Sequence, residues 1–523
     1  MVDGSRSGKE SAVNAGDLSG QDARETVCPP EVRAAIVAQA SRGGKQPEEA
    51  GPTERNRVTS GGVKGGRKVN ASSEGRCEEE PSGVFRRAGN KQEGEDLWEA
   101  HKAERGVWSE KMLVALRNGV KGNKWFSLID KVRRMDVLEL AWEKVRSNAG
   151  GCGVDGVSVE CFGKDSQNRL LAVKEQLERG TYQPHAVKRI WIPKPGSAEK
   201  RPLGIPTVRD RVVQTAMRMV MEPIFEHGFA EQSYGFRPGR SCHDALRRVE
   251  ELLKSGSIHV VDIDIKGYFD AIPRERLMEK VEEKIADGRL LGLIEAFLNQ
   301  KVMEGMESWE SEKGTPQGAV ISPLLANIYL DEMDWKLAQV GIEMVRYADD
   351  IVLLCREAKE ADQAMEEVRQ WMEGAGLELN VAKTRVVDMG KTGSHFDFLG
   401  YRFWRGKRGN LRRFIRPKSQ RNLRERIKPL TKRANGHSME TLVAKLNPIL
   451  RGWYGYFKHA SADALEEVDG WVRNRLRGIL RKRRGGRGRG RGMDNHRWGN
   501  GYFAKLGLYS LIEARAKETT SLQ

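Results

Sequence analysis

The 523-residue sequence predicts an α+β fold followed by a basic, helical C-terminal region. Strand-like segments rich in β-branched residues alternate irregularly with longer helical segments up to about residue 400. Past residue 410 the pattern is helical and basic throughout, with 31 Lys and Arg against nine Asp and Glu between 401 and 523. That region carries a net charge of +22, whereas the first 400 residues carry −5. A charge placed so unevenly predicts a nucleic-acid partner for the C-terminal region.

The composition narrows the class of protein further. The six cysteines are scattered without a C-x-x-C pair, so neither a zinc site nor a disulfide framework is expected. No apolar run approaches the ~18 residues that a membrane span needs, and the N-terminus lacks the apolar segment of a secretory signal. We therefore expect a soluble cytosolic protein. Residues 1–98 are rich in Gly, Ser, Glu and Arg with almost no apolar periodicity, which predicts a disordered arm.

Periodicity predicts the structural elements in chain order. Tryptophans and aliphatic residues recur at helical spacing between 108 and 132, and glycines at 150–156 indicate a loop. The stretch 258–265 alternates and is β-branched, as a buried strand should be. The other expected elements are a strand at 187–195 ending in a Pro-Gly turn, an amphipathic helix at 209–229, a helical region at 274–299, a helix at 322–340 and a hairpin around Asp349.

Two groups of carboxylates stand out in this pattern. Two apolar runs flank Tyr347-Ala348-Asp349-Asp350, which predicts a hairpin with adjacent carboxylates at its turn. About 85 residues upstream, Asp262 and Asp264 share one face of the predicted strand by their two-residue spacing. Like charges so placed repel unless a cation lies between them, and hard oxygen ligands from two strand ends suit two Mg²⁺ ions. Such ions activate a primer 3′-hydroxyl and stabilise a pyrophosphate leaving group.

Together these motifs resemble those of bacterial group II intron-encoded proteins, which join a reverse transcriptase to an RNA maturase domain. The similarity covers roughly residues 100–520, with the motifs in the family's order. It implies a right-hand polymerase with fingers and palm, followed by an α-helical thumb and maturase domain. Asp264 would be the first metal ligand because it opens the block Asp-Ile-Lys-Gly-Tyr-Phe-Asp, with Asp349 and Asp350 as the others and Ile265 in the same metal-binding set. Asp262 lies outside the block and is the runner-up.

The resemblance also implies a site for deoxynucleoside triphosphates. Lys194 and Arg201 match the fingers hairpin that grips the triphosphate, with Lys200 as a rival, and their chemistry suits phosphate oxygens. Phe269 falls where the family has its steric gate against a ribose 2′-hydroxyl, although core packing is the alternative. Gln317, in the loop Gly-Thr-Pro-Gln-Gly, would contact the nucleotide, and Lys383 would lie near the pyrophosphate.

Further motifs extend the resemblance to the template and to RNA. Arg237 and Arg240 resemble the template-contacting segment. The block at 396–401 matches the end of the palm, 446–457 resembles the thumb and maturase helix, and 498–511 resembles the family's C-terminal ending. The Arg/Gly tract at 481–491 is expected to be a flexible phosphate-binding loop.

These matches predict four regions: a disordered arm at 1–98, fingers and palm at 99–408, a helical thumb and maturase domain at 409–480, and the basic tract with the maturase ending at 481–523. Some family members add a His-Asn-His endonuclease with cysteine pairs, and no such cluster is present here. Priming would then use an existing DNA 3′ end.

The expected function is therefore RNA-directed DNA synthesis with two Mg²⁺ ions. The protein would bind its own intron RNA, assist splicing and copy that RNA into DNA at a DNA target during retrohoming, in a bacterial cytoplasm and on the nucleoid. Two alternatives remain: a CRISPR-associated or diversity-generating reverse transcriptase, and a non-catalytic RNA-binding splicing factor. The maturase-like block argues against a diversity-generating enzyme, and the three intact aspartates argue against a splicing factor alone.

Overall fold

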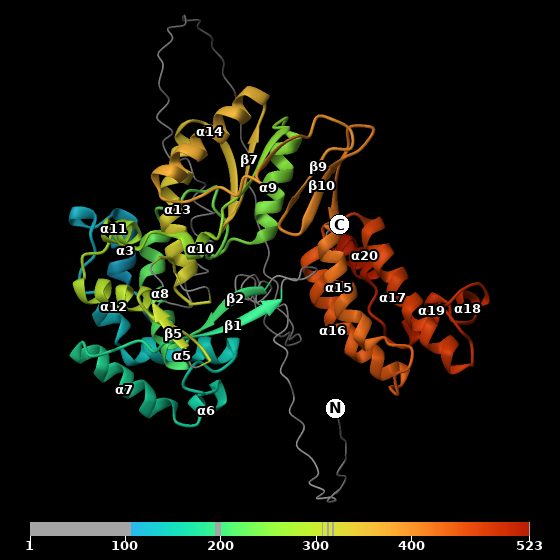
Figure 1. The fold of residues 1–523 in the computed structure, drawn as a ribbon, viewed down its shortest axis with the longest axis horizontal. Coiled ribbons are helices and arrows are strands. Elements are labelled where there is room, and N and C mark those ends of the chain that lie inside the picture. Colours follow the sequence, from blue (N-terminus) through green and yellow to red (C-terminus); the bar gives the residue numbers. More distant parts are fainter. Residues whose placement is uncertain (1–105, 194–199, 306, 311–312, 316–317, 522–523) are drawn as a thin grey trace, which may run out of the picture.

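The computed structural model describes residues 106–521, except 194–199, 306, 311–312 and 316–317. The predicted arm at 1–98 therefore lies outside the described residues. In the described part the strands form two four-stranded sheets and one three-stranded sheet. Figure 1 shows the C-terminal helices, in orange and red, as a lobe beside the rest of the chain, with β9 and β10 between the two. The predicted α+β class, with a helical region after it, is confirmed.

The first sheet has the order β2-β1-β4-β5. β1 (Val187–Pro193) and β2 (Lys200–Ile205) form an antiparallel hairpin, and β1 also pairs in parallel with β4 (Lys301–Glu304), which continues into β5 (Glu307–Glu310). Short helices surround this part of the chain, namely α3 (Glu110–Asn118), the 3₁₀ turn η2 (Lys121–Asn123), α4 (Ile129–Val132), α5 (Met135–Asn148), α6 (Val159–Gly163) and α7 (Ser166–Arg179). We call this region the fingers.

The second sheet carries the predicted carboxylates, and we call it the catalytic sheet. Its order is β6-β7-β3-β8, formed by β3 (His259–Asp264), β6 (Glu343–Tyr347), β7 (Asp350–Cys355) and β8 (Arg385–Asp388). Side chains alternate between its faces. Val261 and Ile263 join a core with the helices α8 (Val208–Glu226), α13 (Ser322–Gln339) and α14 (Ala358–Gly374). Val260 and Val352 face the opposite way, into a second core that includes α9 (Cys242–Lys254).

The third sheet leads from the catalytic sheet to the C-terminal helices. Its order is β11-β10-β9, with β9 (His395–Phe398), β10 (Tyr401–Arg405) and β11 (Leu411–Ile415) all antiparallel. The helices that follow are α15 (Pro417–Leu430), α16 (Met439–Phe457), α17 (Ala462–Arg483), α18 (Met493–Arg497), α19 (Asn500–Lys505) and α20 (Leu511–Ser521). No helix within the described ranges is both long enough and apolar enough to cross a bilayer.

Two sequence expectations about elements are wrong, and the helical region predicted at 274–299 forms but is divided. The helical region 274–299 is two helices, α11 (Arg274–Glu282) and α12 (Gly288–Leu298), because the Asp287 side chain caps α12 by accepting from two backbone N–H groups of its first turn. The pattern past residue 410 is not helical from the start, since Leu411–Ile415 alternates and pairs as β11 with β10. The Arg/Gly tract at 481–491 is not wholly a loop, because α17 continues through Arg483.

The helix predicted at 209–229 forms as α8, but its buried residues do not lie along a single face as in an amphipathic helix. α8 buries residues on nearly every face, including Gln214 and the carboxylate of Asp210. Asp210 accepts hydrogen bonds from the hydroxyls of Tyr182 (2.7 Å) and Thr207 (2.8 Å), so its charge is satisfied inside the core. α8 is therefore the central helix of the fingers and palm rather than a surface helix.

Asp331 on α13 gives a pH-dependent prediction. Its carboxylate accepts from the N–H of Ala230 at 3.1 Å, and burial raises its pKa from 3.8 to about 6, with Asp334 adding to the rise and Lys284 and Arg346 opposing it. Because the folded state binds this proton more tightly than the unfolded chain does, its contribution to the free energy of unfolding falls as the pH rises from about 4 through 6. Asp331→Asn keeps the acceptor and removes the charge.

We compare the free energy of unfolding of Asp331→Asn with that of wild type at pH 5.0 and at pH 7.5, from thermal melting. We expect the difference to move by about 1 kcal/mol in favour of the variant as the pH rises between these values. Asp130→Asn, which alters an exposed carboxylate on α4, serves as the control and should show the same difference from wild type at both pH values. An Asp331→Asn difference that does not change with pH would contradict the prediction.

Candidate active site

The ends of neighbouring strands bring the predicted carboxylates to one edge of the catalytic sheet. In the antiparallel pair of β3 and β7, Asp264 lies directly opposite Asp350, the first residue of β7. Tyr347 at the end of β6 also pairs with Asp350, so Asp349 lies with Ala348 in the turn between the two strands. Cβ atoms of directly opposite residues are about 4.5–5.5 Å apart, close enough for two carboxylates to repel strongly without a cation.

A segment that follows α14 wraps around Asp264. The Nδ2 of Asn380 donates to Asp264 Oδ2 at 2.9 Å, and the Nζ of Lys383 contacts the same oxygen at 3.0 Å. The backbone N–H of Asp264 donates to the hydroxyl of Thr384 at 3.3 Å, and its carbonyl accepts from the N–H of Asn380 at 2.8 Å. Lys383 was predicted near the pyrophosphate. The structure places its Nζ on the Asp264 carboxylate, where the ammonium group supplies a positive charge.

Asn380 and Thr384 are site residues that the sequence analysis did not single out. Both flank Lys383 in the motif Leu-Asn-Val-Ala-Lys-Thr, which was used only for its lysine. The signal was present, since Asn and Thr commonly bond neighbouring backbone groups in turns. What the sequence does not show is that this turn bridges back over more than 100 residues to Asp264.

The runner-up carboxylate has a different partner. Asp262 lies opposite Val352 on β7 and opposite Arg385 on β8, and the Nε of Arg385 contacts its Oδ2 at 3.2 Å. Burial raises the pKa of Asp262, and Arg385 opposes the rise. Asp262 is thus held in an ion pair, and the strand register favours Asp264 as the residue that faces the hairpin carboxylates.

The donor atoms at this edge suit a hard divalent cation, although they are not gathered into a closed ligand set. Among the residues that the structure describes, no group of three or more His, Cys, Asp or Glu side chains lies close enough together to hold a metal ion. Lys383 and Asn380 both engage the same Asp264 oxygen. Ile265 has a buried apolar side chain, so it could offer a metal only its backbone carbonyl.

The fingers hairpin lies near α10 (Tyr268–Ala271), the helix that follows Asp264. Arg201 on β2 pairs with Ile192 on β1, whereas Lys194 lies outside the described residues. Partial desolvation raises the pKa of Asp270, and the charges of Arg189 and Arg201 lower it, so the hairpin arginines act electrostatically on the end of α10.

Gly314 and Gly318, the first and last residues of the predicted Gly-Thr-Pro-Gln-Gly loop, lie close to other backbone segments. Gly314 has a φ of 85°, and a Cβ there would lie 2.6 Å from the Asp270 Cα and from the Phe269 carbonyl oxygen. A Cβ at Gly318 would lie 2.2 Å from the carbonyl oxygen of Gly204 on β2. These glycines therefore allow three backbone segments to meet. Gln317 lies outside the described residues.

Phe269 itself is only partly buried. Its ring packs at the edge of the first core, with its centroid 5.5 Å from that of Tyr268. A partly exposed ring beside the Gly314 loop is compatible with both interpretations of the sequence, the steric gate and core packing. Its steric-gate role stays a prediction.

Arg237 does not have the surroundings of a template-contacting residue. It is 4% exposed, its guanidinium forms a 2.8 Å ion pair with Glu226, and it donates to the carbonyl oxygens of Ala230 and Ser233. A guanidinium enclosed in this way shapes the loop between α8 and α9, and the geometry does not support the predicted template contact. Arg240 is partly buried, with its guanidinium 5.5 Å from the centroid of the Tyr234 ring. Its template role stays a prediction.

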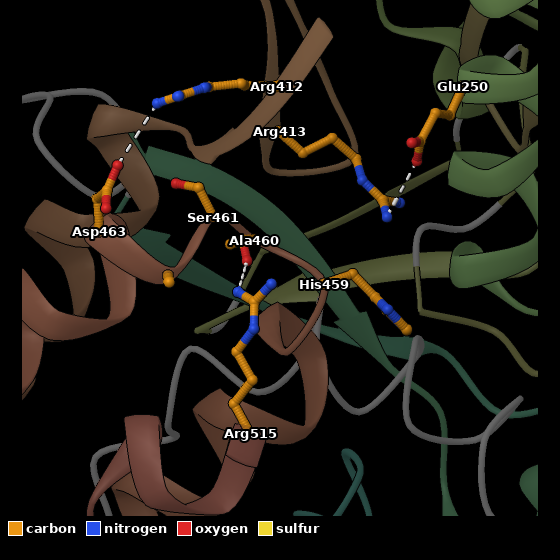
Figure 2. Close-up of a pocket in the computed structure, with 9 residues that line it drawn as sticks. Glu250, Arg412, Arg413, His459, Ala460, Ser461, Asp463 and Arg515 are labelled. Atoms are coloured by element: carbon orange, nitrogen blue, oxygen red, sulfur yellow. Dashed lines mark hydrogen bonds and ion pairs between the residues drawn. The ribbon is translucent and has the colours of Figure 1, made fainter. Parts of the chain in front are cut away.

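A cavity of about 360 Å³ lies away from the carboxylates, between α9, β11, the segment before α17, and α20. Figure 2 shows that its arginines point at partners in the wall: Arg413 contacts Glu250 at 3.0 Å and Arg412 contacts Asp463 at 3.6 Å. The third, Arg515, donates to the carbonyl oxygen of Ala460. The cavity thus lies where the C-terminal helices meet the palm, and each of its three arginines has a partner in the wall.

Comparison with known proteins decides the family. A reverse transcriptase (RNA-dependent DNA polymerase) family model matches residues 192–403, and a group II intron maturase-specific domain matches 420–498. Group II intron-encoded protein LtrA of Lactococcus lactis subsp. cremoris is 38% identical over 213 residues, which cover 41% of this chain and 35% of that protein. Protein YkfC of Escherichia coli (strain K12) is 35% identical over 295 residues, covering 48% of this chain and 76% of that protein.

The chain belongs to the group II intron-encoded proteins. It carries a reverse transcriptase domain followed by a maturase domain, as the sequence motifs predicted. Enzymes with this domain use divalent metal ions, which agrees with the carboxylate chemistry at the edge of the catalytic sheet. The matched part of this chain covers about a third (35%) of the length of LtrA. Among solved structures, the match to telomerase from Candida albicans covers 62% of this chain and 66% of the telomerase chain. The sequence identity is 14% and the TM-score is 0.35.

The contact of Lys383 with Asp264 allows a test in this group II intron-encoded protein. If Lys383 acts as a general acid toward the pyrophosphate, Lys383→Leu should slow single-turnover nucleotide addition by about 10²-fold, since positioned proton donors contribute 10²–10⁴-fold. Rapid-quench measurement on a preformed template–primer complex gives this rate. Lys391→Leu, which removes an exposed lysine paired with Asp388 at 3.5 Å, is the control. Unchanged rates in Lys383→Leu would remove the general-acid role.

Proposed function

We propose that this protein is an RNA-directed DNA polymerase whose catalytic residues are Asp264, Asp349 and Asp350. One observation carries the proposal: Asp264 lies opposite Asp350 in the strand register, with Asp349 in the adjoining turn. Carboxylates gathered at one sheet edge, next to a glycine-lined loop and an arginine-bearing hairpin, supply the groups that nucleotidyl transfer needs.

Two Mg²⁺ ions are the proposed cofactor. Asp264, Asp349 and Asp350 would hold them with carboxylate oxygens, and Ile265 would add its backbone carbonyl. When bound, such ions lower the pKa of the primer 3′-hydroxyl and stabilise charge on the leaving pyrophosphate. Asn380 would orient Asp264 through its 2.9 Å hydrogen bond, and Lys383 neutralises the same carboxylate in the protein alone.

The deoxynucleoside triphosphate would lie between the hairpin and the catalytic sheet. Arg201, with Lys194, would bind the triphosphate, and Phe269 would exclude a ribose 2′-hydroxyl. Gln317 would contact the nucleotide from the loop that Gly314 and Gly318 anchor against α10 and β2. Arg240 would contact the template strand.

Intron RNA is the proposed partner of the C-terminal region, where the maturase match and the net charge of +22 coincide. The protein would assist splicing of that RNA and then copy it from a DNA primer at the target during retrohoming, in the bacterial cytoplasm and on the nucleoid. The proposed regions are fingers and palm at 99–408, thumb and maturase at 409–480, and the basic ending at 481–523. β10 and β11 pair across the first of these boundaries and α17 crosses the second.

Primer extension tests the polymerase. On a poly(rA)/oligo(dT) substrate we expect Mg²⁺-dependent DNA product, and its absence would refute the proposal. A splicing reaction with an intron RNA that retains domains V and VI tests the maturase role. Faster splicing with protein than without it is expected at moderate Mg²⁺, and equal rates would refute that role.

A further inference from the structure

A buried ion pair lies directly beneath the catalytic turn. Arg346 on β6 and Asp334 on α13 are both fully buried, and the Nε of Arg346 donates to the two Asp334 oxygens at 2.8 and 2.9 Å. Only part of the guanidinium is needed for this pair. Arg346 stands immediately before Tyr347 of the Tyr-Ala-Asp-Asp motif.

The remaining edge of the same guanidinium reaches the turn itself. Nη1 of Arg346 donates to the carbonyl oxygen of Ala348 at 3.2 Å and to Oδ1 of Asn327 at 2.9 Å. Ala348 has a φ of 57°, in the left-handed region that a side chain disfavours, and it directly precedes Asp349. A strained residue persists only where its surroundings hold it, and Arg346 supplies a donor at that point.

A second set of contacts holds the other side of the turn. The Nδ2 of Asn327 donates to the carbonyl oxygen of Gly235 at 2.8 Å, and the Gly235 backbone packs so closely that an added Cβ would lie 2.3 Å from the Ala348 nitrogen. The N–H of Tyr234 donates to the carbonyl oxygen of Arg346 at 2.8 Å. The turn is therefore clamped between the 234–235 backbone and the Arg346 side chain.

We propose that Arg346 is a positioning residue for DNA synthesis, which sets the carboxylates of Asp349 and Asp350 by holding the Ala348 carbonyl. Asp334 compensates the buried charge of the guanidinium, whereas Asn327 accepts from it and links it to Gly235. The proposal rests on the proposed function, because it assigns Arg346 to the geometry of that active site. Misplacement of reacting groups by about 1 Å can slow a reaction by about 10²-fold, so a side chain with no contact to substrate can control the rate.

Two variants separate positioning from stability. Asp334→Asn leaves a buried Arg346 without its counter-charge but keeps its donors to Ala348 and Asn327. The double variant Asp334→Asn/Arg346→Met removes both charges together with those donors. Because an unpaired buried charge is more damaging than a neutral pair, the double variant should melt at the higher temperature. Its DNA synthesis should nevertheless be slower, by about 30- to 100-fold against wild type, whereas Asp334→Asn should stay within about threefold.

Of the two variants, the double variant is thus expected to have the higher melting temperature and the lower rate. A purely structural role of Arg346 does not produce this reversal. Single-turnover primer extension well below the melting temperatures gives the rates. Electron paramagnetic resonance gives Mn²⁺ affinity without nucleotide, and it should fall about tenfold in the double variant only. Rates or Mn²⁺ affinities that follow stability would overturn the proposal.

Two further cases are a double variant that does not fold and a wild-type protein that makes no DNA. If the double variant does not fold, Arg346→Lys takes its place. A lysine lacks the planar fork with which the guanidinium donates to Asp334 and to the Ala348 carbonyl together, so a rate about tenfold below wild type is expected, and a wild-type rate overturns the proposal. A wild-type protein that makes no DNA refutes the proposed function instead. The Mn²⁺ affinities then still decide whether Arg346 positions the carboxylates.

Discussion

Asp349→Ala should abolish DNA synthesis while RNA binding and splicing persist. Asp349 lies in the turn between β6 and β7, beside the Asp264–Asp350 pair, so its loss removes a carboxylate from the proposed metal site. A metal ion contributes several kcal/mol of charge stabilisation in the transition state. Each 1.36 kcal/mol is a factor of ten, so we expect a fall of at least about 10³-fold in the single-turnover rate.

RNA binding and splicing should persist in this variant because the maturase match at 420–498 lies outside the catalytic sheet. Splicing of intron RNA and filter binding at fixed salt should therefore match wild type within about twofold, with the salt stated because phosphate contacts dominate affinity. Asp362→Ala, which removes an exposed carboxylate on α14, controls for loss of charge. Loss of splicing together with synthesis in a folded Asp349→Ala protein would contradict this division.

Gly235→Ala should have the second-largest effect. A Cβ at this position would lie 2.3 Å from the Ala348 nitrogen and 2.8 Å from the Tyr347 carbonyl carbon. Both contacts are backbone, so the hairpin turn or the 234–235 segment has to move. We expect a loss of about 1–3 kcal/mol in stability and a fall of about 10²-fold in DNA synthesis, because Asp349 follows Ala348 directly.

Gly292→Ala offers a matched control, since it adds the same methyl group on helix α12 where nothing lies within 4 Å. It should leave DNA synthesis unchanged and raise stability slightly, by up to about 1 kcal/mol, as Gly to Ala does inside a helix. Thermal melting and primer extension measure both variants. If Gly235→Ala behaves like Gly292→Ala, the backbone of the 234–235 segment is not what holds the catalytic turn.

Local pattern was enough to predict the family and the catalytic hairpin. Met344 and Val345 before the turn and the apolar run after Asp350 are a local signal, and both strands form as expected. Asp264 could be placed on a strand by the β-branched run around it, and the structure sets that strand beside the hairpin.

Which charged side chains are buried with a partner could not be predicted. The motif around Arg237 resembles the family's template-contacting segment, yet Glu226 and two carbonyl groups enclose the side chain. Charge alone does not tell a solvated guanidinium from a buried one, since burial depends on what the tertiary fold places around it. Arg346 was missed for the related reason that its partner Asp334 looks like an ordinary polar residue on a helix.

Short strands were also beyond local pattern. β11 contains Arg412 and Arg413, so its basic composition masked an alternation of only five residues. β4 and β5 have four residues each and are strands because β1 offers an edge on which β4 pairs. Strand propensity depends on such neighbours, which a sequence does not show.

The catalytic sheet separates two apolar cores, and one of them is shared with the C-terminal helices. Val260, Val345 and Val352 belong to the same apolar cluster as Leu446, Leu450 and Leu511 of the C-terminal helices. The polymerase half therefore lacks one wall of its own interior if the chain is cut after the palm. By thermodynamic linkage, any RNA that binds only the folded C-terminal helices also stabilises the sheet that bears the aspartates. RNA binding at those helices and the placement of the aspartates would thus be coupled through one shared interior.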